Sequence, residues 1–114
     1  MKINKITKGQ DLSLPDSNPL QSSKVSGSSI NVKNYNEQTF DGSDIGIWEC
    51  NPGHFIRQVL QAEYSYIISG KCIFTCENGK EIPLSAGDTV FFPPNTRGEW
   101  HIIEKLRKSY LILK

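Results

Sequence analysis

The 114-residue chain is 37% hydrophobic and 22% charged, with a formal net charge of +1 at pH 7. This length suits a single domain with its own core. The near-neutral charge and scattered basic residues give no reason to expect nucleic acid as a partner, and apolar runs of only a few residues exclude membrane-spanning helices. Three cysteines without a disulfide framework, and a basic start with no apolar segment behind it, favour a cytoplasmic protein with reduced thiols.

Residues 1–29 differ in composition from the rest of the chain and are rich in Ser, Asn, Lys, Asp, Gly and Pro. Their few aliphatic side chains follow neither the period of a strand nor that of a helix. Pro15 and Pro19 also oppose a helix through the middle of the segment. We expect a polar extended arm, either a disordered tail or a segment packed across the barrel or a partner subunit.

From residue 30 onwards the sequence is typical of short strands separated by turns. Asn51-Pro52-Gly53 is one turn signal, and the Asn78-Gly79 pair is favoured in hairpins. No segment has a convincing helical pattern. The expected strands cover residues 31–36, 45–50, 54–61, 63–69, 71–76, 81–84, 88–92, 99–103 and 109–113. Such a series predicts an all-β sandwich or barrel over residues 30–114.

Two spacings in this region resemble known family motifs. Gly87 is followed after five residues by Pro93 and after one more by Asn95, as in the second motif of the cupins. Upstream, Glu63 and Gly70 are separated by six residues, as at the end of the first cupin motif. Because both motifs occur in order, the chain is similar to the cupin superfamily. The resemblance implies a jelly-roll barrel of antiparallel strands, the double-stranded β-helix.

Further short patterns resemble one branch of small single-domain cupins, which includes ureidoglycine aminohydrolase-type domains. They are Gly46-Ile-Trp48-Glu49, Pro52-Gly53, Tyr66-Ile-Ile-x-Gly70, Ala86-Gly87-Asp88, Gly98-x-Trp100 and Arg107-Lys108-x-Tyr110. The fold hosts isomerases, dioxygenases, sugar binders and storage proteins, so the resemblance does not fix a reaction.

The metal ligands of the family are missing apart from one. Metal-binding cupins have two histidines shortly before the glutamate of the first motif, and a third in the second motif; Glu63 corresponds to that glutamate. The histidine positions hold other residues: Arg57 and Val59, or Ile56 and Gln58 in the alternative register, and Gly98 in the second motif. One carboxylate does not hold iron, manganese or zinc tightly. We therefore predict no tightly bound metal and no cofactor.

Strand parity predicts which side chains enter the barrel once the motif orients Glu63 inward. The expected inward residues are Ser65, Ile67, Ser69, Trp100 and Ile102. The expected outward residues are Tyr64, Tyr66, Ile68 and His101. Large apolar groups on an outer surface need a cover, so we predict a homodimer, or an arm that lies over them.

The candidate ligand-binding residues are Trp48, Arg57, Glu63 and Trp100, and Glu63 is also the candidate catalytic residue. Arg57 would pair with Glu63, clamp a small anion, or else lie in solvent. A buried Glu63 would be either paired or neutral, and in the neutral form available for acid–base work. Either Trp48 or Glu49 faces inward. Trp100 is expected to fill core rather than serve as a ligand platform.

We interpret Arg107-Lys108 as a solvated strand edge. The cysteines Cys72 and Cys76 are expected to be apolar fillers. The favoured function is binding of a small polar metabolite inside the barrel, without the three-histidine metal site. One alternative is an aminohydrolase or isomerase-like enzyme whose metal is held by unusual ligands such as Glu63, Cys50 or His54. Another is a structural or regulatory subunit with a filled barrel.

Overall fold

The structure, a computed structural model, describes residues 2–114. Within this range all regular structure is β-strand, and every strand pairing is antiparallel. The strands are β1 (Leu20–Gln21), β2 (Ser29–Ile30), β3 (Val32–Gln38), β4 (Asp44–Cys50), β5 (Gly53–Val59), β6 (Glu63–Cys76), β7 (Glu81–Ser85), β8 (Thr89–Phe92) and β9 (Thr96–Ile112). The predicted all-β jelly-roll fold is confirmed. None of the described residues belongs to a helix long and apolar enough to cross a membrane.

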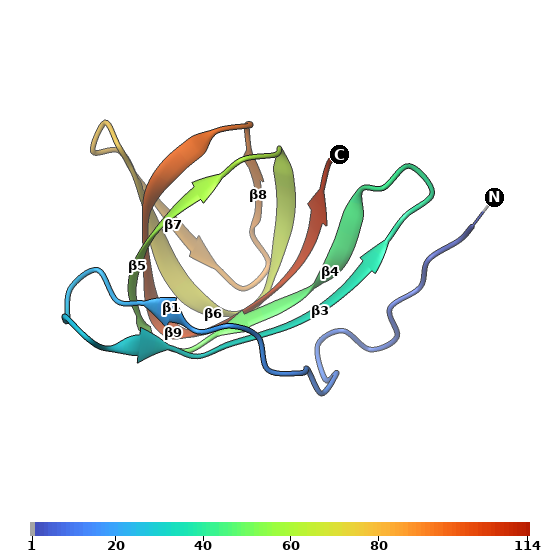
Figure 1. The fold of residues 1–114 in the computed structure, drawn as a ribbon, viewed down its shortest axis with the longest axis horizontal. Helices are drawn as coiled ribbons and strands as arrows, with labels where there is room; N and C mark the ends of the chain where they lie inside the picture. The colour runs from blue at the N-terminus through green and yellow to red at the C-terminus, as the bar shows by residue number, and fades with distance from the viewer. Residues whose placement is uncertain (1) are drawn as a thin grey trace.

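Two long strands, β6 and β9, form the frame of the barrel (Figure 1). The main sheet runs β3-β4-β9-β6-β7, while β5 also pairs with β9 and β8 also pairs with β6. Strand β9 pairs with β5 through residues 96–102 and with β4 through residues 106–112. Strand β6 likewise pairs first with β8 and then with β7. Each long strand therefore contributes to both halves of the barrel.

The expected breaks at Gly70 and between residues 103 and 109 are wrong, because β6 and β9 continue through them. The pairing of β6 with β9 shifts register around Ser69 and Lys71. Gly70 has a φ of 94° there, and a Cβ on it would collide with the carbonyl oxygen of Lys105. The glycine thus permits a bulge that bends the strand without ending it.

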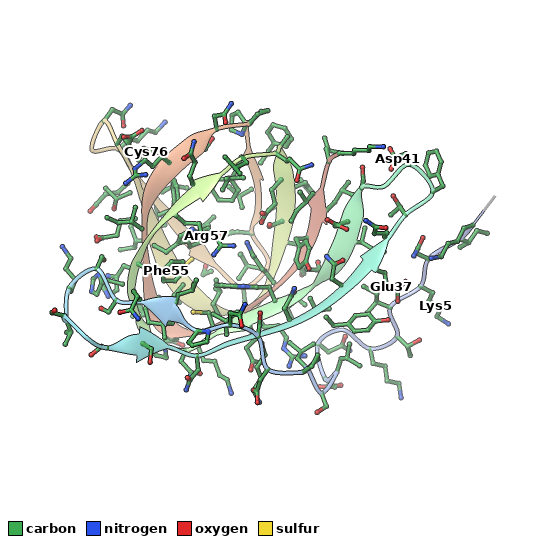
Figure 2. All side chains as sticks on the ribbon, in the orientation of Figure 1. Lys5, Glu37, Asp41, Phe55, Arg57 and Cys76 are labelled. Carbon is green, nitrogen blue, oxygen red and sulfur yellow. The ribbon has the colours of Figure 1, made fainter. Side chains whose placement is uncertain are left out.

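Side-chain alternation follows the predicted parity up to this bulge. Glu63, Ser65 and Ile67 are buried, whereas Tyr64 and Tyr66 are exposed. On β5, Phe55 and Arg57 both lie within the ring of strands in Figure 2. The inward prediction for Ser69 is wrong: it is exposed, since the bulge displaces the alternation of β6.

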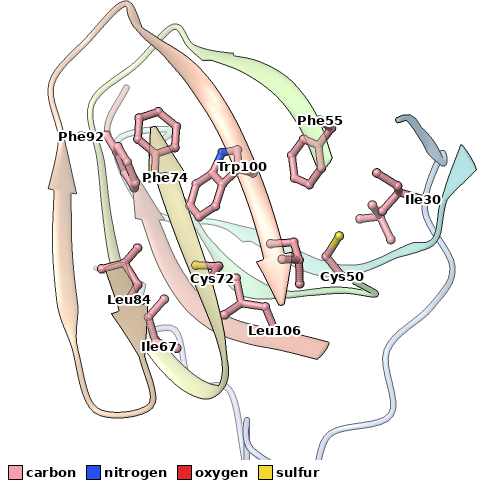
Figure 3. Packing of buried hydrophobic residues seen from close by; sticks show 12 residues of the cluster. Ile30, Cys50, Phe55, Ile67, Cys72, Phe74, Leu84, Phe92, Trp100 and Leu106 are labelled. Atoms are coloured by element: carbon pink, nitrogen blue, oxygen red, sulfur yellow. The ribbon is translucent and has the colours of Figure 1, made fainter. Parts of the chain in front are cut away.

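The core consists of aromatic and aliphatic side chains from both halves of the barrel (Figure 3). Trp100 lies at its centre, 4% exposed, with its ring centroid 5.1 Å from Phe74, 5.6 Å from Phe92 and 6.4 Å from Phe55. His101 is partly exposed and Ile102 is buried, as parity predicts. The core expectation for Trp100 agrees with this packing.

The segment before residue 30 lies alongside β3 (Figure 1). The amide of Ser17 donates to the Val32 carbonyl at 2.9 Å, and the amide of Asn34 donates to the Pro15 carbonyl at 3.0 Å. Leu14 is buried beside them. The main chain of the arm therefore extends the hydrogen-bonding of the sheet at its β3 edge.

Candidate functional site

A cavity of about 120 Å³ lies inside the barrel beside Glu63. Its wall is built by five strands, and all four candidate ligand-binding residues contribute to it. The lining residues are Asn34 on β3, Trp48 on β4, Arg57 and Val59 on β5, Glu63 on β6, and Trp100, Lys108, Tyr110 and Ile112 on β9. Residues far apart in the sequence are thus brought to one place by the closure of the barrel.

Glu63 is the first residue of β6, and its carboxylate lines the cavity. The Nζ atom of Lys108 lies 2.6 Å from its Oε2 atom, and the Ser65 hydroxyl donates to the same oxygen at 2.7 Å. Burial by itself would raise the pKa of Glu63, but the Lys108 ammonium and the two hydrogen bonds outweigh it and lower that pKa overall. Of the two states left open by the sequence, Glu63 is the paired, ionised carboxylate.

Lys108 is a site residue that sequence reasoning missed. It is only 7% exposed, and its ammonium lies 5.1 Å from the ring centroids of both Trp48 and Trp100. The two indoles and the carboxylate of Glu63 together satisfy a cation that would otherwise be costly to bury. The interpretation of Lys108 as part of a solvated strand edge is wrong.

Strand parity is the feature of the sequence that could have identified Lys108 as an inward residue. Along β9 the even-numbered residues face the interior, interrupted only at Glu104 near the bulge, so continuing the count from Trp100 leads to Lys108. The buried positions are Gly98, Trp100, Ile102, Leu106, Lys108 and Tyr110. A second signal was chemical, since an inward glutamate without a metal needs another cation.

The neighbouring Arg107 points to the opposite face and is not solvated either. Its Nε and Nη2 atoms lie 3.1 and 3.0 Å from Oε1 of Glu49, and Nη1 donates to the Gly9 carbonyl at 2.7 Å. Both charged side chains are 12% exposed. Glu49 therefore faces outward and Trp48 inward, which settles the orientation that the sequence left open.

Tyr110 and Asn34 form the side wall of the cavity, and sequence reasoning did not single them out as site residues. The Tyr110 hydroxyl donates to Oδ1 of Asn34 and accepts from Nδ2 of Asn36, both at 2.9 Å. Burial raises the pKa of Tyr110, so its hydroxyl stays protonated. Gly46 lies opposite on β4, where a Cβ would collide with the Tyr110 hydroxyl. The glycine of the Gly46-Ile-Trp48 pattern thus gives the tyrosine its room.

Arg57 enters the cavity wall from β5 but does not pair with Glu63. It is largely exposed, and among the described residues no carboxylate forms an ion pair with its guanidinium and no group accepts a hydrogen bond from it. Its positive charge is close enough to contribute to the lowered pKa of Glu63, as the smallest of the causes. Arg57 is therefore an unpaired cation beside the cavity.

The donor set does not fit a transition metal. Residues 2–114 contain no group of three or more His, Cys, Asp or Glu side chains placed to hold a metal ion. Glu63 is the one carboxylate that lines the cavity in this range, and an ammonium already contacts it. Cys50 instead donates to the Asn51 carbonyl at 3.3 Å, and His54 stacks on His101 with ring centroids 3.9 Å apart. The unusual ligands considered from the sequence are not brought together.

The buried thiols of Cys50 and Cys72 are expected to be unreactive near neutral pH. Burial raises the pKa of Cys50 to about 12 and that of Cys72 to about 11, so neither forms a thiolate near neutral pH. Cys72 packs in the core with Phe74, and Cys76 is partly buried on the same strand. These positions agree with the interpretation of the cysteines as apolar fillers.

Comparison with known proteins places the chain among small cupins. A family model described as the EutQ-like cupin domain matches residues 38–110. A DUF861-family protein of known structure from Thermotoga maritima is 36% identical, with a TM-score of 0.58 over 59% of this chain and 76% of that one. A DUF861-family protein of unknown function from Pseudomonas syringae is 25% identical, with a TM-score of 0.78 over 91% of this chain. This chain spans only 46% of that protein.

The EutQ protein of Clostridium difficile is 19% identical, with a TM-score of 0.73 over 96% of this chain and 90% of that one. At this identity the similarity concerns the fold. No curated protein matches the chain.

Proposed function

Because the chain belongs to the EutQ-like cupin domain family, we propose that its barrel binds a small polar metabolite in the cavity at Glu63, without a resident transition metal. The observation that carries this proposal is the Glu63–Lys108 pair, at 2.6 Å, in the wall of a cavity beside a core of aromatic and aliphatic side chains. A cytoplasmic location stays a prediction.

The cost of burying charge supports a binding role for this pair. Replacing a buried ion pair with apolar side chains of similar volume is often neutral or stabilising, so stability alone is a weak reason for a barrel to contain such a pair. The cavity beside it has a volume of about 120 Å³, several times the ~30 Å³ that a water molecule occupies in the liquid. Both features favour a ligand site over a filled, purely structural barrel.

A second candidate is an aminohydrolase or isomerase-like activity. Four residues of the motifs that resemble that branch line the cavity, namely Trp48, Trp100, Lys108 and Tyr110. Others, such as Gly46 and Tyr66, lie outside it. In such a reaction the ionised Glu63 could accept a proton, and the adjacent ammonium could donate one. The lowered pKa makes Glu63 a weak base, so this observation supports binding more strongly than proton transfer.

A homodimer remains part of the proposal. The outward Tyr64, Tyr66 and Ile68 line a mostly apolar groove of about 480 Å³, and Ile6 and Gly9 of the arm form its other side. The arm thus covers these side chains in part. Sedimentation of the intact chain at tens of micromolar is expected to give a dimer, and a monomer would contradict this part of the proposal.

The two tryptophans of the chain, Trp48 and Trp100, both line the cavity, so indole signals report on it directly. A library of small polar metabolites is screened by the two indole N–H resonances in nuclear magnetic resonance spectra. We expect binders that shift these resonances in the parent chain. Binding should fail in Glu63→Gln/Lys108→Met, a double variant that removes both charges with little change of volume.

Two outcomes would contradict the proposed function. One is a library in which no compound moves either indole resonance. The other is a set of compounds that bind the double variant as tightly as the parent, since their binding would not depend on the Glu63–Lys108 pair.

A further inference from the structure

We propose that the ligand is a small carboxylate anion and that Arg57 receives its carboxylate group. This inference rests on the proposed function and names its ligand class. Its basis is the charge of the cavity lining, the absence of an ion-pair partner for Arg57 among the described residues, and the volume of the cavity.

The lining carries one uncompensated positive charge. The carboxylate of Glu63 neutralises the ammonium of Lys108 across 2.6 Å, and the Tyr110 hydroxyl is neutral. This leaves the guanidinium of Arg57, also part of the lining. A neutral ligand would leave that charge unused, and a cationic one would be repelled by it.

Arg57 differs from the other two arginines of the chain in forming no ion pair with an acidic side chain of the described residues. Arg107 binds Glu49 at 3.0 Å, and Arg97 lies 4.0 Å from Glu77. Among residues 2–114, no ion pair or side-chain hydrogen bond involves Arg57. A guanidinium presents a planar fork of donors that matches a carboxylate in two parallel hydrogen bonds.

The rest of the lining limits the size and character of the ligand. A space of about 120 Å³ holds only a few heavy atoms, which favours a small ligand over a nucleotide or a sugar phosphate enclosed in the barrel. Val59 and Ile112 offer apolar contact, and Lys108 and Asn34 can meet one further polar atom. The second end of the ligand should not be acidic, because it would approach the carboxylate of Glu63.

The test compares three probes of similar chain length: butyrate, its isosteric amide butyramide, and butylammonium. They are titrated at constant ionic strength, with the indole resonances of Trp48 and Trp100 as the readout. We expect butyrate to shift these resonances in a saturable way. Butyramide should bind at least about tenfold more weakly, as expected for the loss of a charge-assisted contact, and butylammonium should not bind.

The variant Arg57→Gln removes the charge while keeping a polar side chain at a largely exposed position. It should weaken butyrate by about tenfold or more. The matched control is Arg97→Gln on the adjacent strand β9, where Arg97 lies opposite Gln58 but does not line the cavity. Butyrate affinity should be unchanged in this control.

The outcomes separate this inference from the proposed function. If butyramide binds as well as butyrate, or Arg57→Gln leaves butyrate affinity unchanged, the carboxylate assignment is overturned while a barrel ligand is retained. If none of the three probes moves an indole resonance, the carboxylate assignment also falls, and the metabolite library then decides whether any barrel ligand exists.

Discussion

Two adjacent residues of β9 form ion pairs on opposite faces of the barrel wall, and the pairs differ in what surrounds them. Lys108 points inward to Glu63, beneath two indoles and beside a cavity. Arg107 points outward to Glu49 and also binds the carbonyl of Gly9 in the arm.

The contrast indicates that ion pairs formed by two adjacent residues of one strand can differ in role. In the outer pair, two nitrogen atoms of the Arg107 guanidinium contact Glu49 on β4, and the third donates to the Gly9 carbonyl, which joins the arm to the sheet. The inner pair uses a compact ammonium, which donates one hydrogen bond to Glu63 and lines the cavity. We therefore propose a structural role for the outer pair and a ligand-binding role for the inner pair.

The largest expected effect follows from breaking the inner pair on one side. Lys108→Met leaves the carboxylate of Glu63 buried with only Ser65 as a donor. Such an uncompensated buried charge costs about 3–5 kcal/mol, which a urea titration will show as a large fall in the unfolding midpoint.

The matched control is Glu63→Gln/Lys108→Met, which has no charge left to compensate and should recover most of the loss. Near-parental stability of Lys108→Met alone would mean that water or a relaxed carboxylate compensates Glu63, and that the inner pair resembles the outer one.

Trp100→Ala should have a slightly smaller effect, although it removes more atoms. Truncation of a large buried aromatic side chain costs about 3–5 kcal/mol. We expect the lower end of this range, because one side of the indole already borders the cavity and Lys108. Phe92→Ala, on the same aromatic cluster but outside the cavity lining, is the comparison. A Trp100→Ala protein as stable as the parent would show that the indole serves the pocket and not the core.

Breaking the outer pair should cost less than breaking the inner one. Arg107→Gln loses hydrogen bonds to a partly buried carboxylate and to the Gly9 carbonyl, worth about 1–3 kcal/mol together. Lys105 limits the loss, since its ammonium remains 3.7 Å from Glu49. The amides around Gly9 should exchange faster with solvent.

Lys105→Gln is the control for the outer face, because its side chain is 61% exposed and its effect should stay within about 0.5 kcal/mol. A ligand that binds the parent should bind Arg107→Gln equally well. Weaker ligand binding in Arg107→Gln would contradict the division of the two pairs.

More of the fold than of the candidate site could be predicted from the sequence. Turn signals, short β-rich runs and the glycine and proline spacing indicated an antiparallel barrel, and the parity of Glu63 and Trp100 was correct. The bulge at Gly70 could not be derived, because a glycine with positive φ ends some strands and bends others, and the choice depends on the partner strand.

The candidate residues lie together as expected, but their pairing was not predicted, and their role in ligand binding stays a prediction. Glu63, Trp48, Trp100 and Arg57 do meet at one cavity. Arg57 was the evident cation near the motif, whereas the actual partner of Glu63 is Lys108, 45 residues further along the chain. Which cation reaches a buried carboxylate depends on the register of β5 against β9 and of β9 against β6. A single sequence does not reveal these registers.

The smallest expected effect concerns pH and isolates Glu63. Its pKa is lowered in the folded state below the ordinary value of 4.5, chiefly because the ammonium of Lys108 and two hydrogen bonds outweigh burial. Below about pH 4.5 the unfolded chain therefore binds more protons at this residue than the folded chain does. The stabilisation is fully present above this value and is lost as pH falls through the folded pKa. As pH falls below 4.5, the free energy of unfolding of the parent should decrease more steeply than that of Glu63→Gln/Lys108→Met. Acidic groups such as Glu37, Asp41 and Glu99, whose pKa values are also lowered, are present in both proteins and cancel in the difference. Parallel curves for the two proteins would mean that the inner carboxylate is as weakly held as an exposed one.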